Sequence, residues 1–252
     1  MAKIKDRTGE VGVNNDGEEM RIIRYGGAND IDVRFEDGTV VEHKAYYNFL
    51  KGKIKNPYFP SFYGVGFIGN GKFKPFDENG KPTKCYIAWK NMMKRCYCLK
   101  FHKNRPRYSH CTVDEKWLNF QVFAEWYYSH YYEIENEQMA LDKDILHKGN
   151  KVYSANTCVF VPSSINNLFV KSNKIRGKYP IGVTKHGDKF VAQLTKDNEQ
   201  IYLGIYTTPE EAFLAYKKAK EAYIKEVAEK YKSQIPQKLY DAMMNYKVEI
   251  DD

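Results

Sequence analysis

The chain has 252 residues and carries 40 lysines and arginines against 32 aspartates and glutamates, which gives a net charge of +8. This length allows two or three small domains, and the basic excess favours a polyanionic partner. No apolar run reaches the ~18 residues of a membrane span, and the first ten residues are polar and charged, so we expect a cytoplasmic protein without a membrane partner.

Charge is sorted along the chain. Residues 84–107 contain eight basic residues and no acidic one, and residues 171–196 contain seven basic residues and a single acidic one, Asp188. A surface that follows a phosphate backbone needs positive charge clustered in this way. Either run alone is typical of a solvated face, whereas the two together favour nucleic-acid binding. In the first run the candidate DNA contacts are Lys90, Lys94 and Arg95.

The five cysteines are Cys85, Cys96, Cys98, Cys111 and Cys158, and no two of them form a C-x-x-C pair. The usual spacing of a zinc site is therefore missing. We predict buried apolar thiols instead.

Residues 1–60 predict a small β-rich domain. The segments 20–25 and 30–43 alternate apolar and polar residues, and Asp37-Gly38 is typical of a hairpin turn. A short helix that ends at Gly52 follows over "KAYYNFLKG". These elements predict a small twisted β-barrel or a curled sheet, and fold analogy alone indicates no function for it. Residues 61–83, rich in glycine and proline, predict an irregular connector.

Residues 84–172 predict two helices and then a hairpin. In "CYIAWKNMMKRCYC" apolar residues recur at helical spacing, which gives one core side and one basic side. "DEKWLNFQVFAEWYYSHYY" predicts a single second helix with Asp114 as its N-cap. The pattern then indicates a strand over 141–145, a loop, a strand over 158–161 and a helix over 163–171.

The strings "YIAWKNMMKRCY", "VDEKWLNFQVFAEW" and "LDKDILHKGNKVYSANTCVFVPSSINNL" occur in this order between residues 86 and 168. Together they resemble a large group of phage-borne H-N-H-like proteins, which includes homing-type endonucleases. The resemblance implies a ββα-metal core that uses Mg²⁺ or another divalent metal. In such a core one imidazole deprotonates water, and side chains of the first strand and the helix hold the metal on the scissile phosphate.

Carried over position by position, the resemblance puts Lys143 where the general-base histidine belongs. Lysine is a poor water-activating base at neutral pH, so nuclease activity is doubtful. His147 could replace the base or be simply solvated, and Asn150 could serve as the middle asparagine in place of Asn156, as Asn167 could in place of Asn166 on the helix. The candidate catalytic residues are Asp142, Lys143, Asp144, His147 and Asn156, and the candidate metal ligands are Asp142 and Asn166.

Residues 173–232 predict three strands, over 181–185, 189–195 and 200–206, and a long helix that Thr208 caps with Pro209 at its first position. Strand alternation assigns two faces to this sheet. The residues expected to face the helix are Phe190, Ala192, Leu194, Ile201 and Leu203, and those expected to face away are Val191, Gln193, Thr195, Gln200 and Tyr202. Residues 233–252 predict a short amphipathic helix and an acidic tail.

The string from Gly182 to Tyr216 resembles the DNA-binding domain of plant ethylene-response (APETALA-type) factors, which is also attached to phage H-N-H proteins. The resemblance implies that the outward sheet face enters the major groove of double-stranded DNA. Arginines of the plant family are missing here, so we expect a looser sequence preference, with Lys185, Lys189 and Lys196 on phosphates. The candidate base-reading residues are Thr184, His186, Gln193, Thr195, Gln200 and Tyr202.

The sequence thus predicts an α+β, multidomain protein with a β-barrel, an H-N-H-like core with flanking helices, and a three-stranded sheet packed on one long helix. We expect a DNA-binding protein of a phage or mobile element, acting in the bacterial host cell, on an endonuclease-like scaffold whose cleavage is left open. The alternative is a non-catalytic phage inhibitor that acts on a host defence complex or its DNA. A purely structural protein would leave the basic runs without a role.

Overall fold

The computed structural model describes residues 5–170 and 178–252. The chain divides into two compact units, residues 1–128 and residues 129–252. Helices and antiparallel sheets are mixed in the chain, as expected for the α+β class. None of the helices in the described ranges is both long and apolar enough to cross a membrane.

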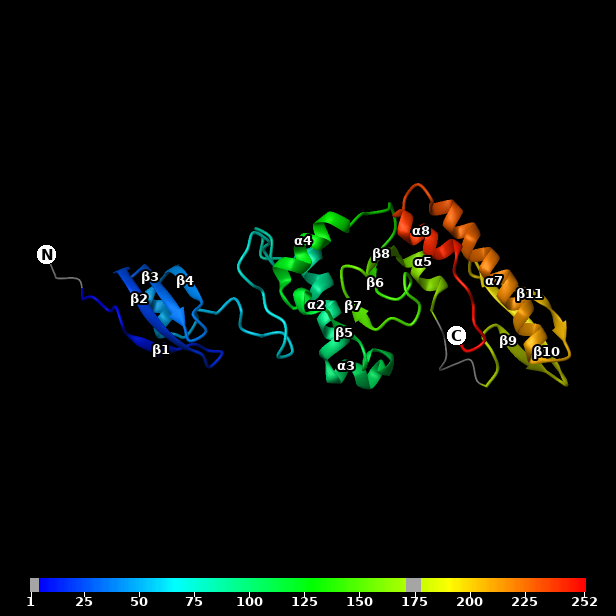
Figure 1. Ribbon diagram of the computed structural model, residues 1–252, viewed down its shortest axis with the longest axis horizontal. Helices are drawn as coiled ribbons and strands as arrows, with labels where there is room; N and C mark the ends of the chain where they lie inside the picture. Colours follow the sequence, from blue (N-terminus) through cyan, green and yellow to red (C-terminus); the bar gives the residue numbers. More distant parts are fainter. Residues whose placement is uncertain (1–4, 171–177) are drawn as a thin grey trace. The chain divides into compact units, whose positions relative to one another are not determined.

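An open four-stranded antiparallel sheet begins the first unit (Figure 1). Its strands, in the order β1-β2-β3-β4, are β1 (Val11–Val13), β2 (Glu19–Gly27), β3 (Asp30–Phe35) and β4 (Val40–Lys44). The predicted turn at Asp37-Gly38 joins β3 to β4, and Gly38 has a φ of +86°. The expected barrel is not closed in the described residues, because β1 and β4 are the two edges of the sheet and four short strands are too few to close on themselves.

One face of this sheet is the core of the N-terminal part. Alternate residues of β2 and β3 point to the same face and are buried, as strand geometry requires. Helix α1 (Tyr46–Leu50) covers that face with Tyr46 and Phe49, and Ile54 adds to it. The buried sheet residues are Met20, Ile22, Ile31, Val33 and Phe35.

Arg24 joins two carboxylates near the turn between β2 and β3 of the same sheet. Its guanidinium donates to both oxygens of Asp30, at 2.8 and 2.7 Å, and to both oxygens of Asp32. His43 Nδ1 lies 2.8 Å from Asp30 Oδ1, and the His43 amide donates to Asp32 Oδ1. The hydrogen bonds from Arg24 are the main cause that lowers the pKa of Asp30 and of Asp32 below the usual range.

This network predicts a pH dependence of stability. A carboxyl group whose pKa is lowered by folding stabilises the fold above its unfolded pKa near ~4, and this contribution is lost as the pH falls through the folded pKa. We expect Arg24→Gln to lower the thermal midpoint at neutral pH and to make its fall in acid shallower than in the natural protein. Circular dichroism melts over a pH series measure both effects. Arg34→Gln, an exposed change on β3, is the control, and equal pH profiles for the two variants would contradict the prediction.

Helix α2 (Lys84–Tyr97) supplies buried residues to the rest of the first unit. It starts at Thr83, whose side chain accepts from the Tyr86 amide, and it buries Trp89, Met92 and Met93 completely. Trp89 Nε1 donates to the Trp117 carbonyl at 2.8 Å. Helix α3 (Leu99–Asn104), a 3₁₀ turn over Pro106–Tyr108 and the short strand β5 (Thr112–Val113) follow.

The predicted single second helix is wrong, because the chain breaks it at Asn119. Asp114 caps a 3₁₀ turn over Glu115–Leu118, and helix α4 (Phe120–His130) begins after an extended residue. The cause is Phe67 of the connector, whose amide donates to the Leu118 carbonyl and whose carbonyl accepts from the Phe120 amide. The Asn119 side chain then accepts from the Gln121 amide and starts α4.

The second unit begins with the strand, loop, strand and helix order that the sequence predicts. Strand β6 (Met139–Asp142) pairs antiparallel with β8 (Val159–Pro162), β7 (Val152–Tyr153) lies in the connection, and α5 (Ser163–Leu168) follows β8 directly. We call residues 139–168 the nuclease-like hairpin, after the family that its sequence resembles. The predicted end of its helix at residue 171 and the predicted domain boundary at 172/173 lie outside the described residues.

A three-stranded antiparallel sheet and a long helix complete the unit (Figure 1). Strands β9 (Val183–His186), β10 (Lys189–Lys196) and β11 (Glu199–Tyr206) have the order β11-β10-β9, and α7 (Pro209–Tyr231) packs on one face. Thr208 and Glu211 form a capping box with Pro209 in the first turn, which confirms the predicted start of the helix. The other end of α7 and α8 (Gln237–Met244) pack on the nuclease-like hairpin, so α7 contributes to the cores of both elements.

Candidate nucleic-acid interface and nuclease-like hairpin

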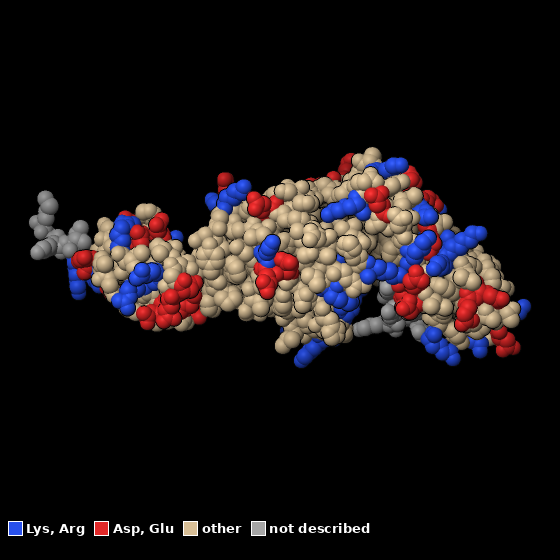
Figure 2. All heavy atoms as spheres, viewed as in Figure 1, with Lys and Arg blue, Asp and Glu red and all other residues tan. Residues whose placement is uncertain are grey.

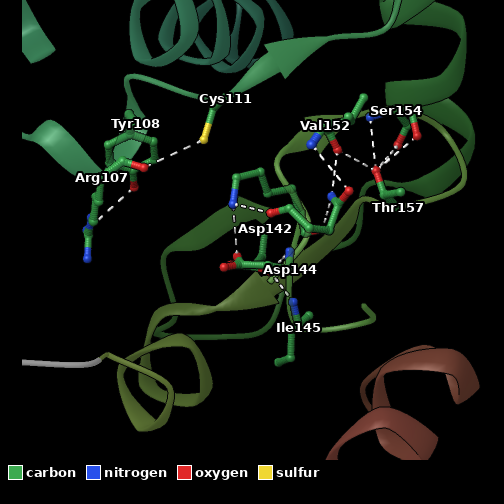
Figure 3. Close-up of polar contacts among 11 residues, drawn as sticks. Arg107, Tyr108, Cys111, Asp142, Asp144, Ile145, Val152, Ser154 and Thr157 are labelled. Carbon is green, nitrogen blue, oxygen red and sulfur yellow. Dashed lines mark hydrogen bonds and ion pairs between the residues drawn. The ribbon is translucent and has the colours of Figure 1, made fainter. Parts of the chain in front are cut away.

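Asp142 ends β6 and folds the chain back on itself. Its Oδ1 accepts from the amides of Asp144 and Ile145, both at 2.8 Å, and Figure 3 shows these bonds. Burial, with the charge of Asp144 as a second cause, raises the pKa of Asp142. Ile145 enters the core beyond this turn. The Asp142 carboxylate therefore stabilises the turn that follows β6.

Lys143 is buried, with 5% of its surface exposed. Its Nζ donates to the Asn150 carbonyl at 3.0 Å, lies 3.4 Å from Asp144 Oδ1 and stands over the ring of Tyr153. Asn150 in turn donates from its Nδ2 to the Lys143 carbonyl at 2.7 Å. Lys143, which the resemblance puts in the position of the general base, thus closes the loop between β6 and β7. A general base must instead reach the proton of a water on the substrate.

No hydrogen bond or ion pair joins Asp142 to His147, Asn156 or Asn166 in the described residues. His147 and Asn156 are exposed, Asn156 in the turn that Ser154 and Thr157 close through their side chains (Figure 3). Asn166 lies half-buried on α5 and Asn167 is exposed. Asn150, which the sequence left as an alternative to Asn156, is the asparagine that organises the loop.

The fit of a divalent metal to the nuclease-like hairpin is poor. In the described ranges one group of three possible His, Cys, Asp or Glu ligands comes together, and it lies elsewhere, at Asp30, Asp32 and His43. In the hairpin, Asp142 and Asn166 would have to hold an ion with substrate phosphate and water, while Oδ1 of Asp142 already accepts two amides.

The group at Asp30, Asp32 and His43 does not fit a metal either. The Arg24 guanidinium already donates to all four carboxylate oxygens, and a cation would have to displace it. The cysteines form no disulfide and no such cluster in the described residues, and burial raises the pKa of Cys85 to about 12. Four of the five cysteines are buried as predicted, whereas Cys98 is only half-buried.

The outward face of the three-stranded sheet brings together the residues expected to read bases. Register pairs Thr184 with Val191, Gln193 with Tyr202 and Thr195 with Gln200, and paired residues of an antiparallel sheet share a face. Since Ala192 and Leu194 pack on α7, these pairs lie on the opposite side. We call this side the reading face; its members are Thr184, His186, Lys189, Val191, Gln193, Thr195, Gln200, Tyr202 and Ile205.

The reading face is exposed except at Val191, which is buried, and at Gln193, which is half-buried. It carries one defined polar pair. Tyr202 exposes 62% of its surface, and Gln200 Nε2 donates to Gln193 Oε1 at 2.7 Å. This bond leaves an amide donor on Gln193 and a carbonyl acceptor on Gln200. The two together complement the N7 acceptor and N6 donor that adenine presents in the major groove.

Two of the three lysines expected on phosphates lie on the other side of the sheet. Lys185 opposes Phe190, which packs against the α7 side, and Lys196 forms an ion pair with Glu226 of α7 at 2.6 Å. Lys189, opposite His186, shares the reading face. Acidic and basic side chains lie side by side over α7 and α8 in Figure 2.

Ile205 joins the reading face because of a β-bulge that the alternation did not predict. Gln193 pairs with Tyr202 but Ala192 pairs with Gly204, so Leu203 is the extra residue. Gly204 has a φ of +128°, which glycine adopts readily. Without the bulge, alternation from Tyr202 would turn Ile205 toward the helix. Ile201, expected to face α7, opposes Leu194 at the sheet edge and is partly exposed.

The candidate contacts on α2 lie on its solvent side. Lys90 and Lys94 are exposed, with Nζ over the rings of Tyr86 and Phe101, and neither is ion-paired with a carboxylate of the described residues. Arg95 is half-buried, and its Nε donates to the Asn91 carbonyl. These lysines can bind phosphates without first breaking an ion pair.

No model of a known protein family, no curated protein and no solved structure matches this chain.

Proposed function

We propose that the chain binds double-stranded DNA through the reading face and that its nuclease-like hairpin does not cleave it. The observation that carries the proposal is the two-sidedness of the three-stranded sheet. One side is sealed by α7, while the other exposes the polar side chains expected to read bases. The major groove is wide enough for β-strands, and its base edges offer the donors and acceptors that such side chains bind.

The distribution of free charge supports the proposal. Lys189 on the reading face and Lys90 and Lys94 on α2 have no acidic partner within the part of the chain that the structure describes, so they can bind phosphates at once. Phosphate contacts of this kind give affinity, and base contacts give specificity. The burial of Lys143 supports the second half of the proposal, because its ammonium group is held inside the loop.

The test compares the two kinds of contact. We expect Gln193→Ala with Gln200→Ala to reduce discrimination between adenine and other bases at one position of a selected site, by about 1–3 kcal/mol. Lys189→Gln should weaken binding to every sequence alike and lower the salt slope by about 1. Selection from a random duplex library, followed by anisotropy titrations over a salt series, measures both.

Lys185→Gln is the matched control, since it removes the same charge from the same sheet on the other side. It should leave discrimination unchanged and affect affinity less than Lys189→Gln. If the Gln193→Ala/Gln200→Ala variant discriminates among sequences as the natural protein does, the reading face does not read bases.

A further inference from the structure

A groove runs along the edge strand β4 in the N-terminal sheet, with a volume of about 810 Å³. All five residues of β4 line it, from Val40 to Lys44, and the extended segment Lys53–Lys55 forms the facing wall. Asn48, Pro57 and Asn70 complete the lining. We call this the β4 groove.

The wall opposite β4 is firmly attached to the sheet. Ile54 is buried in the core, and Asn56 is buried while its Nδ2 donates to Glu18 Oε1 at 2.8 Å and to Asp37 Oδ2 at 2.9 Å. In an extended chain successive side chains point to opposite sides. Lys53 and Lys55 therefore point away from the core and are exposed. The groove is a preformed feature of the fold.

The β4 groove is positively charged. Lys44, Lys53 and Lys55 line it against one carboxylate, Glu42, and none of the three lysines is ion-paired in the described ranges 5–170 and 178–252. In the second unit, by contrast, Lys148 is paired with Asp252 and Lys196 with Glu226. Three lysines without acidic partners along one groove suit a chain of phosphates.

An exposed aromatic ring lies beside these charges. Tyr47 exposes 59% of its surface, and Lys53 Nζ lies 5.8 Å from the centre of its ring. Aromatic rings next to a basic groove bind the faces of unpaired bases, which a duplex keeps inside its stack and an acidic peptide does not have. The combination favours a single strand of nucleic acid over either of these partners.

We propose that the β4 groove binds a single strand of nucleic acid, with Lys44, Lys53 and Lys55 on successive phosphates and Tyr47 stacked on a base. This site lies on the N-terminal sheet, apart from the reading face, and does not rest on the function proposed for that face. It gives the protein a contact for unpaired DNA or RNA in addition to its contact with a duplex.

The experiment uses the full chain and a single-stranded oligonucleotide of mixed sequence. In Lys44→Gln/Lys53→Gln/Lys55→Gln, the slope of log affinity against log salt should fall by about 2, since each phosphate contact on a single strand contributes about 0.7. Tyr47→Ala should lower the affinity roughly 5- to 150-fold. The control is Lys218→Gln/Lys225→Gln/Lys230→Gln, which removes the same charge from α7 and should leave the slope unchanged. Thermal melts establish that each variant is folded.

An unchanged slope in the folded triple variant would overturn the proposal. So would a loss seen with duplex but not with the single strand, or full competition by poly-glutamate at equal charge. The Gln193→Ala/Gln200→Ala variant separates this proposal from the previous one. It should keep its affinity for the single strand, whatever happens to its reading of duplex DNA.

Discussion

Gly182→Ala is expected to destabilise the second unit by about 3 kcal/mol or more. Gly182 has a φ of +76°, and a Cβ built there would lie 2.0 Å from Cδ2 of Tyr216 and 2.3 Å from its Cγ. Tyr216 is buried in the core between α7 and the sheet, with 5% of its surface exposed. The variant therefore combines left-handed backbone strain with overpacking of the core. Since whole domains are stable by only about 5–15 kcal/mol, this loss is a large part of the total.

Gly187→Ala is the matched control for this prediction. Gly187 also has a positive φ, +60°, but no heavy atom lies within 4 Å of a Cβ built there. Its loss should be limited to backbone strain, about 1–2 kcal/mol. Urea unfolding of the two variants and the natural chain measures the difference through the midpoints at constant slope. Equal losses would mean that Tyr216 does not press on Gly182.

The three-stranded sheet was predicted well because most of its signals are local. The turn residues, the three strands and the Thr208-Pro209 helix start all depend on a few neighbouring residues, and the structure confirms them. Alternation fails only at the bulge in β11. The string that resembles the APETALA-type domain begins at Gly182 and ends at Tyr216, and these two residues touch. A glycine is required there because α7 packs so close to the chain before β9.

The errors arose where residues far apart in sequence decide the local structure. Phe67, about fifty residues earlier in the chain, breaks the helix at Asn119, and no local propensity near Asn119 predicts this break. Lys196 was predicted to bind phosphates, but it forms an ion pair with Glu226 of α7, thirty residues later in the chain. The bulge at Leu203 and Gly204 has a local signal, the glycine itself, which could have corrected the side of Ile205.

In the nuclease-like hairpin, too, the local sequence predicted the order of the elements but not the contacts of individual side chains. The order of strand, loop, strand and helix was predicted from the pattern, and β6, β8 and α5 confirm it. The resemblance also puts Lys143 in the position expected for the general base. It could not predict that Lys143 is buried and exchanges hydrogen bonds with Asn150, because that depends on how the loop closes.

We expect the purified protein to leave supercoiled plasmid intact in Mg²⁺ or Mn²⁺. The loss of a general base typically costs on the order of 10²–10⁴ in rate. Here we expect more than the loss of one base. Lys143 Nζ contacts Asn150 and Asp144, and Asp142 Oδ1 accepts from two amides, so neither group is available to water or to a metal. DNA affinity should accordingly be no higher with the metal than with a chelator, since Mg²⁺ has no site to bridge to DNA and only competes with lysines for phosphates.

A nicking assay with three variants decides how far the site has been reduced. Lys143→His is expected to restore at most weak nicking, because an imidazole at this position leaves Asp142 in its turn. Asp142→Ala and His147→Ala should change neither nicking nor DNA affinity, His147 being exposed and apart from any cluster of candidate ligands in the described residues. Efficient nicking by the natural protein that disappears in Asp142→Ala or His147→Ala would refute the idea of a reduced site. The base would then be His147 or Asp144, brought into place when DNA binds and the loop held by Lys143 opens.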